Sequence, residues 1–262
     1  AHARDIYHTY VSPEADAEMR RAKLRAAAFV ATVSDYNARH LSALCPEARI
    51  ERLYNGIDLS AFRPIDAPEQ RPGQLIAVGR LVPKKGFDIL LDACGILRDR
   101  GVTFDLSLIG SGPMVAELAA RIAKLGLSDC VRLDGPRPQE DLIERMGQAE
   151  AAVLPCVVTE SGDRDGLPTV LLEAMARALP VVTTTVSGGP EIVEDGVTGR
   201  LCAAGDPVGL ADALEAVLSD RTAARKMGLA GRARAERLFD LTTNAARLRA
   251  MLLDPLSRWE AA

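Results

Sequence analysis

Short apolar runs and amphipathic stretches alternate along the chain from residue 74 onward. A continuous short apolar run is typical of a strand buried on both faces, and apolar positions at a spacing of about 3.6 indicate a helix. The predicted strands lie near 74–79, 104–109, 130–133, 151–154, 180–184 and 198–202, and the predicted helices near 86–99, 113–125, 138–148, 168–179, 207–219 and 221–237. This alternation predicts an α/β fold built on a doubly wound parallel sheet.

The chain before residue 74 follows a different pattern. We expect one strand at 29–33 and one following helix there, which cannot close a sheet alone. Residues 1–62 are therefore predicted to be the remnant of an upstream α/β domain, and the natural polypeptide to be longer by roughly one domain. The predicted organisation is completed by a linker at 63–73, marked by Pro64, Pro68 and Pro72, a main domain at 74–240 and a terminal segment at 241–262 whose first part is an amphipathic helix.

Composition narrows the class of protein. The 262 residues are 48% hydrophobic and 26% charged, which is ordinary for a globular enzyme, and no run approaches the ~18 apolar residues of a transmembrane helix. A net charge of −4 without a basic stripe argues against a nucleic-acid partner. The five cysteines are odd in number and far apart, which indicates core residues in a reducing compartment.

The segment 151–185 carries the first candidate site. Pro168 suits a first-turn position of the helix predicted at 168–179, and the apolar stripe of that helix places Glu173 at its edge. Free N–H groups at the helix start and the helix dipole form an anion site beside Asp165 and Glu173. The residues at that start are Gly166, Leu167, Pro168 and Thr169. A phosphate that carries a sugar or a ribose fits this chemistry; an ordinary capped helix with a surface Glu is the alternative.

A second loop supplies cations. Arg80 and Lys85 follow the strand predicted at 74–79, and ligands bind at the carboxyl edge of an open parallel sheet. An Arg fork and a Lys point charge five residues apart can hold a diphosphate. Only 5 of the 32 basic residues are Lys, so the adjacent pair Lys84–Lys85 is unusual for this chain. The alternative is a solvated turn.

These two segments also carry a family resemblance. VGRLVPKKGFDILLDA (78–93) and DGLPTVLLEAMARALPVVTTTVSGGPEIVEDGVTGRL (165–201) resemble the carboxyl-terminal, donor-binding domain of family-four retaining glycosyltransferases of the GT-B fold. The resemblance also covers four further segments in the order and spacing of the family, SDYNARHL, YNGIDLSAF, LIGSGP and LDGPRP. Within the family, the chain resembles most the bacterial enzymes of exopolysaccharide assembly, of the colanic-acid type. The resemblance implies two facing Rossmann-like domains, with the C-terminal domain complete here and the N-terminal domain truncated.

The resemblance further implies retaining transfer of a hexose from a UDP-, GDP- or ADP-sugar to a saccharide or lipid-linked saccharide, without a metal or other cofactor. Arg80, Lys85 and the helix start would bind the diphosphate, and Glu173 would bind the ribose. Asp165 would bind the sugar, although the Glu-x7-Glu pair of the family has Asp at position 165, one methylene shorter. The turn ending at Arg137 would border the base. The resemblance implies a location in the cytoplasm. It leaves open whether the missing domain associates peripherally with the inner face of the membrane.

His2 belongs to a His-x-x-Asp sequence that matches a loop of the family's first domain. A His there could orient the transferred sugar or relay a proton. A frayed terminal His without a partner is the alternative. We therefore name His2 as a second candidate catalytic residue, beside Asp165.

Other patterns leave alternatives open. Gly110-Ser-Gly112 follows a strand, but Val115 stands where a dinucleotide fingerprint needs its third glycine. Gly110 therefore belongs to a tight turn that either lets backbone approach a ligand or only joins strand to helix. Asp163-Arg-Asp165 resembles an Asp-x-Asp metal site. A metal bound there would contradict the metal-free transfer that the family resemblance implies. A nucleotide-sugar epimerase or hydrolase, a nucleotide-binding fragment without turnover, and a pyridoxal-dependent phosphorylase using Lys85 are the competing functions.

Overall fold

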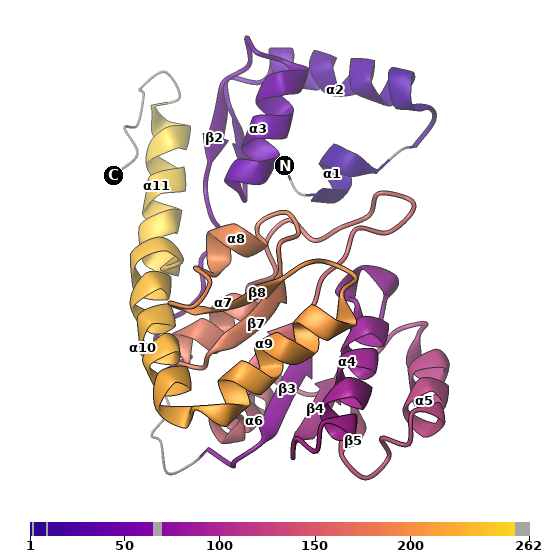
Figure 1. Ribbon diagram of the computed structural model, residues 1–262. Coiled ribbons are helices and arrows are strands. Elements are labelled where there is room, and N and C mark those ends of the chain that lie inside the picture. Colours follow the sequence, from indigo (N-terminus) through magenta and orange to yellow (C-terminus); the bar gives the residue numbers. More distant parts are fainter. Residues whose placement is uncertain (2, 9, 65–69, 255–262) are drawn as a thin grey trace.

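The fold is a parallel sheet of six strands between two helical layers, seen in a computed structural model that describes residues 1, 3–8, 10–64 and 70–254 (Figure 1). The strand order is β5-β4-β3-β6-β7-β8, and every neighbouring pair is parallel. The strands are β3 (Gln74–Val78), β4 (Asp105–Ile109), β5 (Val131–Gly135), β6 (Ala151–Leu154), β7 (Val181–Thr184) and β8 (Gly199–Cys202). The predicted α/β fold class is confirmed.

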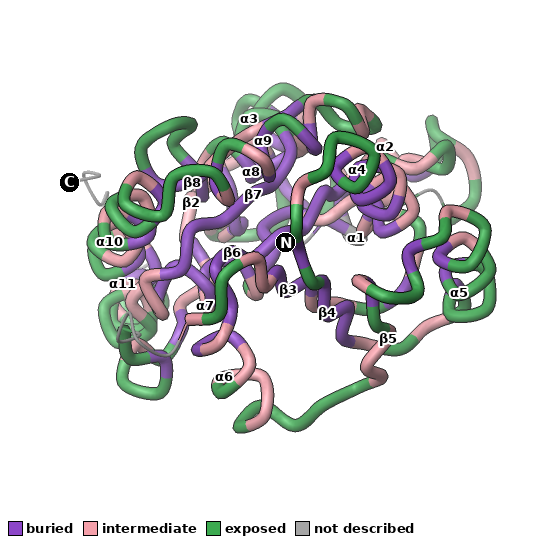
Figure 2. The backbone as a smooth tube through the Cα atoms, turned by 60° about the horizontal axis from the view of Figure 1, so that its bottom comes forward, coloured by how far each residue is buried: buried purple, intermediate pink, exposed green. Residues whose placement is uncertain are grey.

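Helices cover both faces of this sheet. They are α4 (Phe87–Asp99), α5 (Val115–Lys124), α6 (Gln139–Gln148), α7 (Thr169–Ala176), α8 (Gly189–Ile192), α9 (Pro207–Ser219) and α10 (Arg221–Leu238). Helices α4 and α9 pack together on one face, whereas α6 and α7 lie on the other (Figures 1 and 2). Figure 2 shows the strands between these layers as mostly buried, because each presents apolar side chains to both layers.

The predicted helix at 168–179 is too long at its carboxyl end. Helix α7 ends at Ala176, and Ala178 has a left-handed backbone with φ of 57°. The carbonyl oxygen of Ala178 lies against Gly228 of α10, where a Cβ would overlap it. The chain thus turns at Ala178, two residues before Pro180, at the place where α10 packs closely against α7.

Residues 1–52 form a smaller part with its own core. Its elements are α1 (Ala3–Tyr7), α2 (Pro13–Ala26), β1 (Val30–Thr32), α3 (Asp35–Leu44) and β2 (Ile50–Arg52). The single-strand prediction is wrong, because β2 pairs in parallel with β1. Buried Ile6, Leu24 and Leu41 hold the helices on this two-stranded sheet.

Residues 53–64 join the two parts. Tyr54, Ile57 and Phe62 belong to the main core, and Ile57 forms a bridge with Asp240. Helix α11 (Leu241–Leu253) returns from there alongside the smaller part (Figure 1). Residues 65–69 of the predicted linker and 255–262 of the terminal segment lie outside the described residues. None of the helices in the described part is long and apolar enough to cross a membrane.

Candidate donor-binding site

The candidate site lies where the strand order reverses. The chain leaves β3 toward β4 on one side and returns to β6 on the other, so the loops 79–86 and 155–168 meet at the carboxyl edge. The N–H of Val157 donates to the carbonyl oxygen of Lys84 at 3.0 Å. Gly86 has φ of 66°, and a Cβ there would overlap the carbonyl oxygen of Pro155. These contacts fix the two loops against each other.

Two lysines and two carboxylates form the charged centre of this site. Nζ of Lys85 lies 2.5 Å from Oδ2 of Asp165, and Nζ of Lys84 lies 3.1 Å from Asp163 and 3.4 Å from Asp165. The side chains of both lysines are 13% exposed and that of Asp165 is 16% exposed. Burial acts to raise the pKa of Asp165, but attraction to Lys85 and then to Lys84 outweighs it, so the pKa is lowered. Asp165 is therefore ionised at neutral pH.

A cavity of about 290 Å³ opens beside these charges. Its lining residues are Ala3, Val33, Asn55, Lys84, Lys85, Arg164, Asp165, Gly166, Leu167, Pro168 and Thr169. The structure thus brings Lys85 and residues 166–169 together at one cavity, and their ligand contacts stay predictions. Pro168 differs from its prediction: with ψ of 109° it is the N-cap, and the helix begins at Thr169.

Three polar residues of this lining, Asn55, Lys84 and Arg164, have no role predicted from the sequence. In the sequence Lys84 stands out only as half of an unusual lysine pair, although its side chain is as little exposed as that of Lys85, at 13%. Asn55 lies in the YNGIDLSAF segment of the family resemblance, and Arg164 is the middle residue of the Asp-x-Asp sequence. All three line the cavity because loops distant in the sequence converge there.

Glu173 lies on α7 and is half-buried. Its carboxylate has no hydrogen-bond or ion-pair partner among the described residues, and burial raises its pKa. A half-buried carboxylate without a partner is costly to the fold, which is typical of a group kept for a ligand. The structure is therefore compatible with the predicted ribose contact, which stays a prediction.

The unpartnered Glu173 leads to a stability prediction. A carboxyl whose pKa is raised in the folded state binds more protons when folded than when unfolded, so its contribution falls as pH rises through the folded pKa. We expect Glu173→Gln to raise the melting temperature at pH 7 by a few degrees at most and to have almost no effect at pH values below the ordinary pKa of Glu. Thermal melts of both proteins from pH 4 to 8 measure this. An equal or lower melting temperature for Glu173→Gln at pH 7 would contradict the prediction.

Arg80, Gly110 and Arg137 lie at the carboxyl ends of β3, β4 and β5 but do not line the cavity. Arg80 is exposed, and Nε of Arg137 lies 3.6 Å from Asp141 one helical turn on. Gly110 packs against the backbone of Gly79, where a Cβ would overlap its carbonyl oxygen. That contact explains why position 110 needs a residue without a Cβ. The ligand contacts of Arg80, Gly110 and Arg137 stay predictions.

The remaining candidates are His2 and the Asp-x-Asp sequence. His2 lies outside the described residues. Asp163 and Asp165 both face lysines, and within the described residues no cluster of three His, Cys, Asp or Glu side chains could hold a metal ion. Both carboxylates of the Asp-x-Asp sequence are thus paired with lysines, and transfer without a metal stays a prediction.

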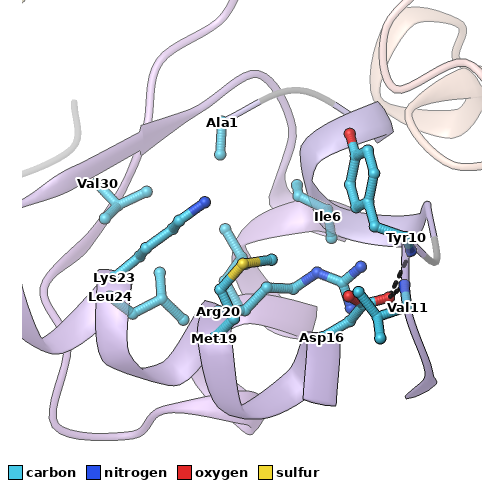
Figure 3. Close-up of a pocket in the computed structure, with 11 residues that line it drawn as sticks. Ala1, Ile6, Tyr10, Val11, Asp16, Met19, Arg20, Lys23, Leu24 and Val30 are labelled. Atoms are coloured by element: carbon cyan, nitrogen blue, oxygen red, sulfur yellow. Dashed lines mark hydrogen bonds between the residues drawn. The ribbon is translucent and has the colours of Figure 1, made fainter. Parts of the chain in front are cut away.

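A second cavity, of about 570 Å³, lies in the smaller part of the molecule (Figure 3). Apolar side chains line most of it, among them Ile6 of α1, Leu24 of α2, Val30 of β1 and Leu41 of α3, and the two site loops contribute none of the lining residues. Figure 3 shows the carboxylate of Asp16 turned to the chain at Tyr10 and Val11, whose N–H groups it accepts. This cavity does not have the features of the charged site described above.

Comparison with known proteins identifies the family. Residues 60–234, which contain both site loops and the whole six-stranded sheet, match the family of glycosyl transferases group 1. The chain belongs to this family. The resemblance found in the sequence is thereby confirmed.

Relatives agree with this assignment. The amylovoran biosynthesis glycosyltransferase AmsK of Erwinia amylovora is 37% identical over 198 residues, which cover 75% of this chain and 48% of that protein. The putative colanic acid biosynthesis glycosyltransferase WcaL of Escherichia coli K12 is 35% identical over 217 residues, 82% of this chain and 52% of that protein. The chain of this group 1 glycosyl transferase thus spans about half the length of these curated relatives.

The fold of this group 1 glycosyl transferase also matches solved structures. Anabaena HepE in complex with UDP and glucose superposes with a TM-score of 0.80 and 22% identity, over 94% of this chain and 70% of that chain. At this identity the match shows the fold alone. Structural neighbours of this kind are GT-B glycosyltransferases, as the sequence resemblance implies.

Proposed function

We propose that this protein transfers a sugar from a nucleotide diphosphate sugar to a saccharide or lipid-linked saccharide in polysaccharide assembly. The observation that carries the proposal is the pair Lys84 and Lys85 facing the start of α7 across a cavity at the switch point of the sheet. Two largely buried cations and a helix N-terminus are suited to bind a diphosphate. The exopolysaccharide relatives support the choice of pathway.

The proposed chemistry depends on charge that develops during the reaction. As the bond between the anomeric carbon and the phosphate oxygen breaks, negative charge grows on the leaving diphosphate. Lys85, Arg80 and the N–H groups at the start of α7 would stabilise that charge where it forms, which lowers the barrier more than ground-state binding does. Glu173 would accept hydrogen bonds from the ribose, and Asp165 from hydroxyls of the sugar. We propose retention of the anomeric configuration, as the family resemblance implies.

The finer features of the reaction are also proposals. We propose a hexose as the transferred sugar, and UDP-glucose as the first donor to test, because HepE was solved with UDP and glucose. GDP- and ADP-sugars are the next candidates. We propose that no metal is needed, since the lysines meet the phosphate charge. We place the protein in the cytoplasm, at the inner membrane face where the acceptor is lipid-linked.

Product analysis on the natural polypeptide that contains this sequence tests the proposal. UDP-, GDP- and ADP-hexoses labelled in the sugar are incubated with and without a saccharide acceptor, and with EDTA. We expect label in the acceptor from one donor class, and a change with EDTA of less than about twofold. Free sugar or an epimer formed without acceptor would support a hydrolase or epimerase instead. Loss of transfer in EDTA, restored by Mg²⁺, would make Asp163 and Asp165 metal ligands.

A further inference from the structure

The first turn of α3 meets the donor-site loop directly. This turn comes from the smaller part of the molecule, and the loop follows β6 of the main sheet (Figure 1). Contacts from residues 164, 166 and 191 converge on residues 35–37. We define residues 35–37 as the docking turn.

Glu191 binds the backbone of the docking turn. One carboxylate oxygen accepts the N–H of Asp35 at 2.6 Å, and the other accepts the N–H of Tyr36 at 2.8 Å. The hydroxyl of Tyr54 donates to the same carboxylate at 3.1 Å. The first N–H groups of a helix lack partners within the helix and carry its positive dipole end, so a carboxylate from another element stabilises them strongly. Glu191 thus fixes the direction in which α3 points at the site.

Arg164 binds the side chains around the same turn. Its Nη1 donates to the hydroxyl oxygen of Tyr36 at 2.8 Å, and its guanidinium lies over the ring of Tyr7, 4.4 Å from the centroid. Its Nε donates to the carbonyl oxygen of Gly162 within its own loop at 3.0 Å. The next residue in the chain is Asp165. Arg164 therefore connects the position of the docking turn to that of the site carboxylate.

Gly166 completes the contact on the other side of Asp165. A Cβ at Gly166 would lie 3.2 Å from Nδ2 of Asn37 and 3.4 Å from Val33. Asn37 is fully buried, and its side-chain oxygen accepts a hydrogen bond from the hydroxyl of Tyr7 at 3.0 Å. The glycine lets the docking turn approach the loop at van der Waals distance. Asp165 is thus flanked in sequence by two residues that both contact this turn.

We propose that the docking turn positions Asp165 for sugar transfer, with Arg164 and Glu191 as positioning residues. Lys85 and Glu173, the proposed diphosphate and ribose contacts, lie outside the loop segment 164–166 that the docking turn holds, so we expect donor binding to depend on this docking less than Asp165 does. Asp165 would depend on it, because its loop is held from both sides by the smaller part. The proposal rests on the proposed function for its kinetic readout, but its structural readout does not require transfer.

Tyr36→Phe removes the hydroxyl that Arg164 binds and keeps the ring. Tyr10→Phe is its control, because no hydrogen bond of the Tyr10 hydroxyl exists among the described residues. We expect Tyr36→Phe to lower kcat for transfer about tenfold with KM for the donor and binding of the nucleoside diphosphate changed less than about twofold. Amide exchange of residues 159–166, where the N–H groups of Thr159 and Gly162 are hydrogen-bonded, should be about tenfold faster at an unchanged melting temperature.

Glu191→Gln tests the second contact, with Glu194→Gln as control, because Glu194 is exposed and its carboxylate lies 3.8 Å from Arg234. We expect Glu191→Gln, but not Glu194→Gln, to lower kcat while the KM for the donor is nearly unchanged, as for Tyr36→Phe. Glu191→Gln should also make amide exchange faster at residues 35–36. If both Tyr36→Phe and Glu191→Gln leave kcat and loop exchange unchanged within about twofold, the positioning role is wrong. If the wild type transfers no sugar, the proposed function fails, whereas the exchange measurement still decides the docking.

Discussion

Lys85→Ala is expected to lower kcat/KM for sugar transfer by about 10²–10³, the loss seen when a group that stabilises developing negative charge is removed. Lys85 is largely buried beside the start of α7, so its charge acts with little screening by water. Steady-state rates of the natural polypeptide with its donor and acceptor measure the effect. We expect Arg80→Ala to lower kcat/KM less than Lys85→Ala does, because Arg80 is exposed and outside the cavity.

The fold should survive this change. Asp165 keeps Lys84 as a partner at 3.4 Å when Lys85 is removed, so no carboxylate is left buried and unpaired. Lys124→Ala is the matched control, because Lys124 is exposed at the far end of α5 and should leave the rate unchanged. A rate for Lys85→Ala within about threefold of wild type would contradict the assignment of Lys85 to the diphosphate.

Asp165→Asn is expected to lower transfer by about 10²–10³ while binding of the bare nucleoside diphosphate is kept or strengthened. The amide has the size of the carboxylate but loses its charge, which Lys85 and Lys84 hold in the ionised form. The proposed partner of Asp165 is the sugar, and the carboxylate also competes with phosphate for Lys85. Single-turnover transfer and calorimetry on the same variant separate the two effects.

Asp163→Asn is the control for this prediction. Asp163 pairs with Lys84 at 3.1 Å but is 46% exposed, so it should change transfer by only a few-fold. Equal losses in Asp163→Asn and Asp165→Asn, with activity dependent on Mg²⁺, would support a metal site instead. Unchanged transfer in Asp165→Asn would exclude a role of this carboxylate in sugar binding.

The strands of the sheet could be predicted from sequence because each is a short apolar run buried on both faces. The run at 151–154 forms β6 over the predicted residues, and both β3 and β7 differ from their predictions by one residue. Strand β2 was missed because Ile50, Glu51 and Arg52 are half-buried and carry no apolar run. The end of α7 was missed because its turn at Ala178 depends on contact with Gly228, which local sequence does not encode.

The candidate site could be predicted in part for a similar reason. The carboxyl ends of parallel strands share one edge, so the loops after β3 and β6, which carry Lys85 and Asp165, meet there, and Nζ of Lys85 lies 2.5 Å from Oδ2 of Asp165. The docking turn could not be predicted. Tyr36 contacts Glu191 and Arg164 across sequence separations of 155 and 128 residues, and neither periodicity nor spacing carries information at that range.

Calorimetry of UDP, GDP and ADP binding to the 262-residue chain and to its Lys85→Ala variant tests the central claim most directly. We expect one of the three to bind weakly, with Kd of about 10–1000 µM, because the ligand's phosphates stay partly in water, and Lys85→Ala to weaken that binding at least about tenfold. Lys124→Ala should bind like wild type. Binding that is equal in the wild type and Lys85→Ala, or absent for all three nucleotides at millimolar concentration, would contradict a diphosphate site between the loops after β3 and β6.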